Sequence, residues 1–161
     1  MNARSLTNKL PSFENILNEL IANICLVTET WFKDSALINR TLEDFTNKSG
    51  YAFLRKDRGG GRHGGGICIC FDPERIQLSK AKIPPTKHEV YAVIGQRRKI
   101  ALLVVYVPPG YNAQQNKSLL DYTNDAVLAL KSKYDDPYIL VWGISTVETA
   151  EQPSGSTLTS K

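Results

Sequence analysis

An acidic residue stands at the end of a short apolar run near the start of the chain. Glu29 follows the run at 24–27 and opens the segment Glu-Thr-Trp. A continuous apolar run of this length is typical of a strand covered on both faces, and the carboxyl ends of such strands open onto the crevice of an α/β sheet. Glu29 is therefore well placed for a functional site, although a lone acid is more often a solvated surface residue.

Two more polar side chains belong to short motifs at comparable places. Asn2 lies in Asn-Ala-Arg-Ser before a helical stretch, and Tyr106 lies in Val-Tyr-Val-Pro-Pro at the end of another apolar strand. Each has an ordinary explanation, because terminal residues fray and strand tyrosines often send the hydroxyl to solvent. Only their order along the chain, together with Glu29, makes them candidates for one site.

The densest basic segment is the glycine-rich stretch at 55–66. It contains Arg55, Lys56, Arg58 and Arg62 with one acid and six glycines. Such a segment can lie against a DNA backbone, where contacts position the duplex and carry little sequence information. The Gly-Lys-Ser/Thr ending of a nucleotide-binding phosphate loop is absent. A flexible hairpin connection whose charges keep it soluble is an equally good interpretation.

Bulk properties are those of an ordinary globular protein. The chain has 161 residues, of which 42% are hydrophobic and 22% charged, and this suits one domain with a sizeable core. A net charge of +4 is compatible with a polyanionic partner without establishing one. No apolar run has the length of a membrane span, and the first residues lack the apolar stretch of a secretory signal. We expect a cytoplasmic or nuclear protein with no membrane contact.

Three cysteines, Cys25, Cys68 and Cys70, lie in apolar runs. Their odd number and their spacing fit neither a disulfide framework nor a tetrahedral zinc site. Cys68 and Cys70 are two positions apart on an expected strand and should point the same way. Buried, reduced thiols are expected.

Apolar spacing predicts the elements that position these residues. Intervals of three and four residues predict an amphipathic helix at 10–21, followed at once by the strand at 24–27. A short helix is expected at 37–45 and a longer one at 116–131. Strands are expected at 51–55, 66–71, 75–80, 88–95 and 99–107, arranged like an antiparallel meander, and a final buried strand at 138–142.

The composition changes after Gly143. Residues 144–161 are rich in Ser and Thr and contain almost no large apolar side chain. Such a segment cannot bury enough surface to offset its ordering entropy. We therefore expect a domain at 1–143 and a disordered tail at 144–161.

The order of several segments resembles the endonuclease/exonuclease/phosphatase superfamily. The matching segments are NARSL…NKL, ICLVTETWF, GYAFLRKDRGGGRHGGGICI, ALLVVYVPPG and YILVWG. Within the superfamily, the chain is most similar to the apurinic-type endonuclease domain of retrotransposons that lack long terminal repeats (LINE-like elements). The resemblance extends from Met1 to Gly143. It implies an α/β (α+β) four-layer sandwich, with two β-sheets packed face to face and flanked by helices.

The resemblance also implies roles for individual residues. Glu29 matches a metal-binding glutamate, with Mg²⁺ or Mn²⁺ as the cofactor, and the metal neutralises charge on the scissile phosphate. Asn2 matches an asparagine that organises the active-site acids, and Tyr106 a tyrosine that approaches the phosphate. Arg4 stands where many members have an acid or amide, and Pro109 where repair enzymes have asparagine. Both departures favour the retrotransposon branch.

Other parts of the family pattern are missing. The family's last matching strand ends in Gly-Asp-Phe-Asn, whereas Gly143 is followed here by Ile144, which can neither accept a proton nor bind a metal. The family's final Ser-Asp-His segment has no counterpart, and its first strand has no room before Asn2. We therefore expect a domain that is truncated at both ends and inactive as this chain.

The function implied is that of a fragment of an Mg-dependent DNA endonuclease, with DNA as partner and no obligate protein partner. The alternative is a non-catalytic DNA-binding or protein-interaction remnant of the same fold. A phosphorylated lipid or sugar as substrate fits the segment order less well. Strand edges and apolar faces left uncovered by truncation favour self-association.

Overall fold

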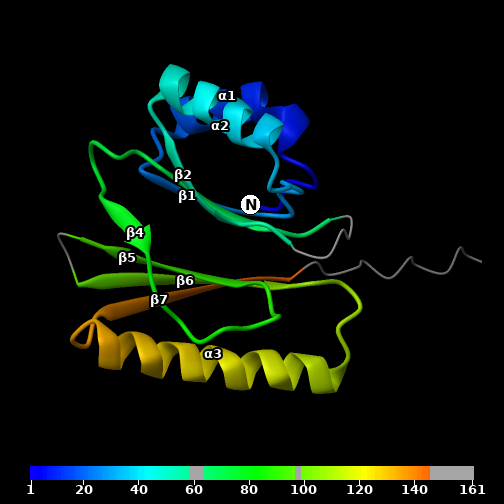
Figure 1. Cartoon of the computed structure of the whole chain (residues 1–161), viewed down its shortest axis with the longest axis vertical. Helices are drawn as coiled ribbons and strands as arrows, with labels where there is room; N and C mark the ends of the chain where they lie inside the picture. Colours follow the sequence, from blue (N-terminus) through cyan, green and yellow to red (C-terminus); the bar gives the residue numbers. More distant parts are fainter. Residues whose placement is uncertain (59–63, 97–98, 146–161) are drawn as a thin grey trace, which may run out of the picture.

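Two β-sheets face each other across the centre of the molecule, and helices cover their outer faces (Figure 1). The computed structural model describes residues 1–58, 64–96 and 99–145. Helices α1 (Leu10–Leu20) and α2 (Ala36–Ser49) lie over one sheet, and α3 (Ala113–Lys133) lies over the other. This order of helix, sheet, sheet and helix confirms the expected four-layer sandwich.

The first sheet contains three strands in the order β1 (Ile24–Thr28), β3 (Ile67–Phe71) and β2 (Ala52–Lys56), paired antiparallel. The N-terminal residues run beside β1 and bridge to it in parallel, from Asn2 to Thr28. The backbone N–H of Thr28 donates to the carbonyl of Met1 at 3.0 Å. This pairing holds Asn2 at the end of β1 from which Glu29 emerges.

The second sheet has the order β4 (Leu78–Lys80), β5 (Val90–Gly95), β6 (Ile100–Val107) and β7 (Tyr138–Ser145). The first three strands are antiparallel, and α3 crosses over to bring β7 parallel to β6. The predicted antiparallel meander is confirmed within each sheet, but it is interrupted between β3 and β4, which lie in different sheets. Local sequence places each strand but does not choose its partner, which depends on contacts distant along the chain.

Three layers of core side chains hold the sandwich together, and alternation along the strands sorts residues between them. On β3, Cys68 and Cys70 face α1 and α2, whereas Ile67 and Ile69 face the second sheet. The middle layer contains Ile67, Ile69, Tyr91, Val93, Leu102, Val104 and Tyr106. All three cysteines are free, with Cys68 and Cys70 buried and Cys25 half-buried. The prediction of reduced thiols, two of them on one face, is confirmed.

Local signals explain where the helices begin and end. Helix α1 tolerates Pro11 in its first turn and matches its predicted range closely. Helix α2 is longer than predicted because Ser35 caps its start, accepting from the N–H of Ile38 at 3.3 Å, and it ends only at Gly50. Helix α3 begins earlier than predicted, at a capping box between Asn112 and Gln115. None of the helices in the described ranges is both long and apolar enough to cross a membrane.

The last strand departs from the prediction in its burial. Tyr138, Leu140 and Trp142 are 81%, 59% and 54% exposed. They are in register with Ile100, Leu102 and Val104 of β6, so they lie on the sheet face that looks toward the first sheet. Nothing among the described residues covers them, and the prediction of a buried strand is wrong. The backbone of β7 also continues through Ile144 and Ser145, two residues past the predicted boundary. The predicted tail lies, from residue 146 on, outside the described residues.

Candidate functional site

One hydrogen bond joins the two sheets at the predicted site. Glu29 follows β1 in the first sheet, and Tyr106 lies on β6 in the second, 77 positions further along the chain. The Tyr106 hydroxyl donates to Oε1 of Glu29. The Tyr106 side chain is fully buried, so its ring belongs to the core between the sheets while its hydroxyl reaches the carboxylate. The structure thus brings together two residues that the sequence singled out separately.

The second oxygen of Glu29 is held by a residue that sequence reasoning missed. Oε2 accepts from the indole Nε1 of Trp31 at 2.5 Å and from the backbone N–H of Gly65 at 3.1 Å. A tryptophan two residues after the acid was visible in the sequence. The direction of its side chain could not be predicted, because the indole N–H reaches Glu29 only through a left-handed turn at these residues.

The backbone around Glu29 is strained and held from two sides. Glu29 and Trp31 both have φ +57°, in the left-handed region, which costs a non-glycine residue about 1–3 kcal/mol. The N-terminal segment stabilises this turn through the N–H of Ser5, which donates to the Glu29 carbonyl at 2.8 Å. The connection between β2 and β3 does so through Gly65, whose carbonyl accepts from the N–H of Trp31 at 3.0 Å. Strain of this kind clusters at functional sites.

The Glu29 carboxylate is stabilised in its charged form. Partial burial disfavours the charge, but hydrogen bonds from Tyr106, Trp31 and the Gly65 N–H, with the nearby charge of Arg58, outweigh that effect. The net result is a pKa of Glu29 below its ordinary value. At neutral pH the site therefore presents a carboxylate anion whose direction is fixed.

Asn2 lies at the same strand end but makes a different contact. It bridges to Thr28, the residue before Glu29, and its side-chain oxygen accepts from the N–H of Arg4 at 3.2 Å. Arg4 has φ +44°, so this bond supports a second left-handed turn beside the site. Asn2 thus helps to fix the N-terminal segment that in turn holds the Glu29 backbone.

A second acid, Glu89, lies buried just before β5 and was also missed by sequence reasoning. It forms an ion pair with Arg58 and accepts from the N–H of Gly66 at 2.7 Å. Its carbonyl accepts from the N–H of Tyr106 at 2.9 Å. Gly65 packs against this pair: a Cβ added there would lie 2.5 Å from Nε of Arg58 and 2.7 Å from Oε2 of Glu89. The sequence signal was an acid inside the predicted apolar strand at 88–95.

The cationic side chains of the predicted basic loop that the structure describes form ion pairs or hydrogen bonds with other residues of the chain. Nε of Arg55 lies 3.2 Å from Asp57, and the ammonium of Lys56 donates to the carbonyls of His88 and Val90 at 2.9 and 3.2 Å. Arg58 pairs with Glu89. Arg62, the fourth predicted residue, lies outside the described residues. These contacts organise the loop around the site, and contact with DNA stays a prediction for all four.

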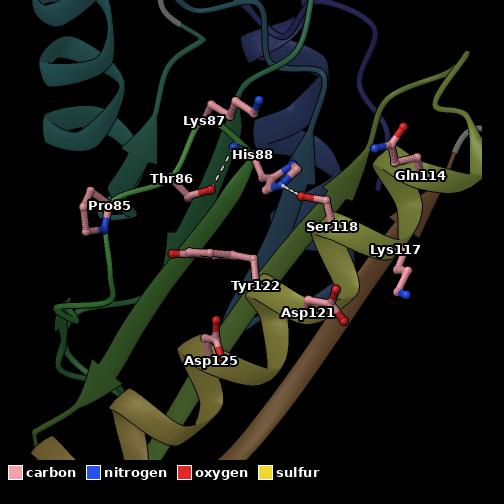
Figure 2. A pocket seen from close by; sticks show the side chains of 10 residues that line it. All are labelled: Pro85, Thr86, Lys87, His88, Gln114, Lys117, Ser118, Asp121, Tyr122 and Asp125. Atoms are coloured by element: carbon pink, nitrogen blue, oxygen red, sulfur yellow. Dashed lines mark hydrogen bonds between the residues drawn. The ribbon is translucent and has the colours of Figure 1, made fainter.

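A cavity of about 1080 Å³ opens beside this loop. Its walls come from three connections that converge there, and include Lys56, Arg58, His88, Glu89, Pro109 and Tyr111. An adjoining cavity of about 530 Å³ lies between the β4–β5 connection and α3. In Figure 2, His88 and Ser118 point toward each other across it, with Nε2 and Oγ 3.1 Å apart. Burial, with the charges of Lys87 and Lys56, lowers the pKa of His88.

Comparison with solved structures identifies the fold. An AP endonuclease from Archaeoglobus fulgidus aligns with a TM-score of 0.57 and 15% identity, over 82% of this chain and 49% of that chain. The 3′ phosphatase NExo from Neisseria, bound to a product DNA hairpin, aligns with a TM-score of 0.57 and 16% identity, over 88% and 54%. The chain has the fold of the endonuclease/exonuclease/phosphatase superfamily.

A third match with this fold is the catalytic domain of human Nocturnin, with a TM-score of 0.59 and 10% identity over 89% of this chain and 60% of that domain. The chain therefore spans about half the length of the solved structures that it matches. No family model matches the sequence. No curated relative matches it either.

The donor atoms around Glu29 bear on whether the site could hold the Mg²⁺ or Mn²⁺ ion that the resemblance implies. Mg²⁺ needs only one or two protein carboxylates, because water and substrate phosphate supply its other oxygens. Oε2 of Glu29 already accepts two hydrogen bonds, so Oε1, which accepts from Tyr106, has the greater remaining capacity. Within the described ranges, no group of three or more His, Cys, Asp or Glu could hold a metal. The donors fit a weakly held, largely hydrated Mg²⁺ or Mn²⁺ and do not fit a structural zinc ion.

Proposed function

We propose that this chain is part of a divalent-metal-dependent DNA endonuclease of the retrotransposon type, whose reaction is hydrolysis of a phosphodiester bond. The observation that carries the proposal is the hydrogen bond from Tyr106 to Glu29. It links an ionised acid to a neutral donor at the strand ends, where the two sheets of a nuclease and phosphatase fold meet. This pairing suits a phosphate group, because the acid can attach a cation while the hydroxyl can face a phosphate oxygen.

Each residue has a part in this proposal. Glu29 would bind the metal, which when bound would neutralise charge on the phosphate and stabilise the leaving oxygen. Tyr106 and Trp31 fix the direction of the carboxylate. Asn2 stabilises the N-terminal segment that holds the strained Glu29 backbone. The match of these residues in order, with Arg4 and Pro109, supports the retrotransposon branch.

We further propose that the chain by itself does not cleave DNA. The resemblance puts an aspartate general base directly after Gly143, and Ile144 occupies that position. In the β6–β7 register Ile144 pairs with Tyr106, so position 144 is at the level of the site. An aliphatic residue there cannot activate water. Loss of a general base commonly costs about 10²- to 10⁴-fold in rate.

The test is relaxation of supercoiled plasmid in the presence of Mg²⁺. The wild-type chain should nick no faster than Glu29→Ala. Ile144→Asp should gain Mg²⁺-dependent nicking, and the double variant Glu29→Ala/Ile144→Asp should lose it again. Nicking by the wild type above the Glu29→Ala level would show that inactivity is wrong. If Ile144→Asp gains no nicking in Mg²⁺ or Mn²⁺, the missing aspartate alone does not account for the inactivity.

The second candidate function is that of a non-catalytic DNA-binding remnant. Ile144 favours it, because the chain keeps the fold but has an aliphatic residue where a general base is expected. It predicts salt-sensitive DNA binding through the basic loop. Substitution of Arg55, Lys56 or Arg58 would also break contacts within the molecule. The test therefore uses Arg62→Gln, with Arg40→Gln on the exposed side of α2 as the matched control. Loss of one phosphate contact should lower the slope of log affinity against log salt by about 1. An unchanged slope, or salt-independent binding, would contradict this function.

A further inference from the structure

Trp31 combines a fixed position with an exposed aromatic ring. Its Nε1 donates to Glu29 at 2.5 Å, and its backbone N–H donates to Gly65 at 3.0 Å. Its φ of +57° turns the side chain back toward the carboxylate. In spite of these restraints the residue is 43% exposed. A large aromatic side chain that is held by its polar edge and open to solvent elsewhere is suited to contact a ligand.

The surroundings of the ring leave room for such a ligand. Gly64 lies against the indole edge, where an added Cβ would be 3.5 Å from Nε1 and 3.9 Å from Cε2. Because position 64 has no side chain, no larger group extends from it over the indole ring. Arg58 lies near enough for its charge to lower the pKa of Glu29, and its ion pair with Glu89 fixes this cation in the same neighbourhood. Aromatic rings beside basic groups are the usual composition of a single-stranded nucleic acid site.

We propose that Trp31 is a base-binding residue, whose exposed ring stacks on an unpaired base of the nucleic acid that reaches Glu29. The identity of the ligand rests on the proposed function. An unpaired base is the appropriate class, because bases within a duplex already stack on their neighbours and present only their edges. The hydrogen bond from Nε1 to Glu29 gives the ring a second effect: it sets the distance between the stacked base and the carboxylate.

The chain contains a natural control. It has two tryptophans, Trp31 and Trp142, and both are exposed. Trp142 lies on β7 opposite Val104 and not at the strand ends where Glu29 and Tyr106 meet. Exposure alone therefore does not distinguish the two residues, whereas position and the bond to Glu29 do. In a Trp142→Phe background, Trp31 is the only tryptophan, and its fluorescence reports on the site alone.

The first experiment measures quenching of Trp31 fluorescence in this background, with a chelator present so that no cleavage or metal binding contributes. The probes are a short single-stranded DNA and the same sequence as a blunt duplex. Saturable quenching is expected with the single strand, with affinity about tenfold or more above that for the duplex. Equal quenching by the duplex, or no quenching by either, would overturn the proposal. This measurement needs no change at position 31.

The second experiment separates the ring from its N–H. Binding of a labelled single strand is measured at a salt concentration that screens phosphate contacts. Trp31→Leu should weaken binding about tenfold, and Trp31→Phe, which keeps an aromatic face, should weaken it much less. Trp142→Leu should have no effect. Wild-type affinity in Trp31→Leu would refute the base-binding role. Metal is absent from both binding experiments. Failure of the endonuclease proposal would therefore appear as absence of cleavage by the Ile144→Asp variant and would not change the measured binding of the single strand.

Discussion

Glu29 is held by groups from separate parts of the chain. Tyr106 comes from β6, Trp31 from the turn after β1 and Gly65 from the connection before β3. Since all three donate to the carboxylate, they stabilise its charged form and lower its pKa. A depressed carboxyl pKa contributes stability that is present above the pKa of the unfolded chain and is lost as pH falls through the pKa of the folded state.

We therefore expect Tyr106→Phe to raise the pKa of Glu29 and to reduce stability at neutral pH. Glu29 is only partly buried, so solvent screening limits the expected loss to about 1 kcal/mol of unfolding free energy. Urea unfolding at neutral and acidic pH measures it. The difference from wild type should shrink below the ordinary carboxyl pKa of 4.5, where Glu29 is protonated in the unfolded chain. Tyr138→Phe, at a residue that is 81% exposed, is the control. A pH-independent difference would mean that Tyr106 contributes only packing.

At the scale of elements, the connection from β2 to β3 is the part of the fold that closes on the site. Gly65 donates to Glu29 and accepts from Trp31, and Gly66 donates to Glu89. Glycine is required at position 65 on two counts, since φ is +78° and the neighbouring ion pair leaves no space for a Cβ. Sequence reasoning treated these glycines as a source of flexibility, whereas the described ones, Gly64, Gly65 and Gly66, have close neighbours.

Gly65→Ala should therefore be strongly destabilising. A methyl group would displace Arg58 or Glu89 and disturb a partly buried ion pair, and the expected cost is at least about 2 kcal/mol. Gly50→Ala is the matched control, because Gly50 has φ +79° but nothing within 4 Å of an added Cβ. Gly50→Ala should therefore lose only the free energy of backbone strain, about 1 kcal/mol. Urea unfolding of both variants gives the comparison. Equal losses would show that the ion pair moves aside at no cost.

At the scale of the molecule, the sequence predicted what depends on local pattern. Periodicity placed α1, β1 and β6, and the motif order placed Glu29 and Tyr106 in one site and implied the four-layer sandwich. It could not divide the middle strands between two sheets, because pairing is decided by contacts between distant segments. It also missed Trp31 and Glu89. Their roles depend on a left-handed turn and on a tertiary ion pair, which leave no periodic signal.

The apolar run of β7 shows another limit of local pattern, since it indicates which side chains avoid water but not whether a neighbour covers them. Tyr138, Leu140 and Trp142 continue the inter-sheet face beyond β6, yet remain largely exposed. The eight residues of β7 contain no charge and no proline, the usual devices that protect a strand edge.

We expect the chain to self-associate through this face, and Leu140→Lys to suppress the association. A lysine in the centre of the face would have to bury its charge on contact, whereas in the monomer it is solvated. Light scattering coupled to size-exclusion chromatography over a range of concentrations measures the effect. Leu128→Lys on α3 is the matched control, since Leu128 is 65% exposed but belongs to the helix that covers the other face of this sheet. A wild type that stays monomeric at every concentration, or equal suppression by Leu128→Lys, would contradict the role of β7. If Leu140→Lys suppresses association and Leu128→Lys does not, the exposed apolar face of β7 is the surface through which the chain associates.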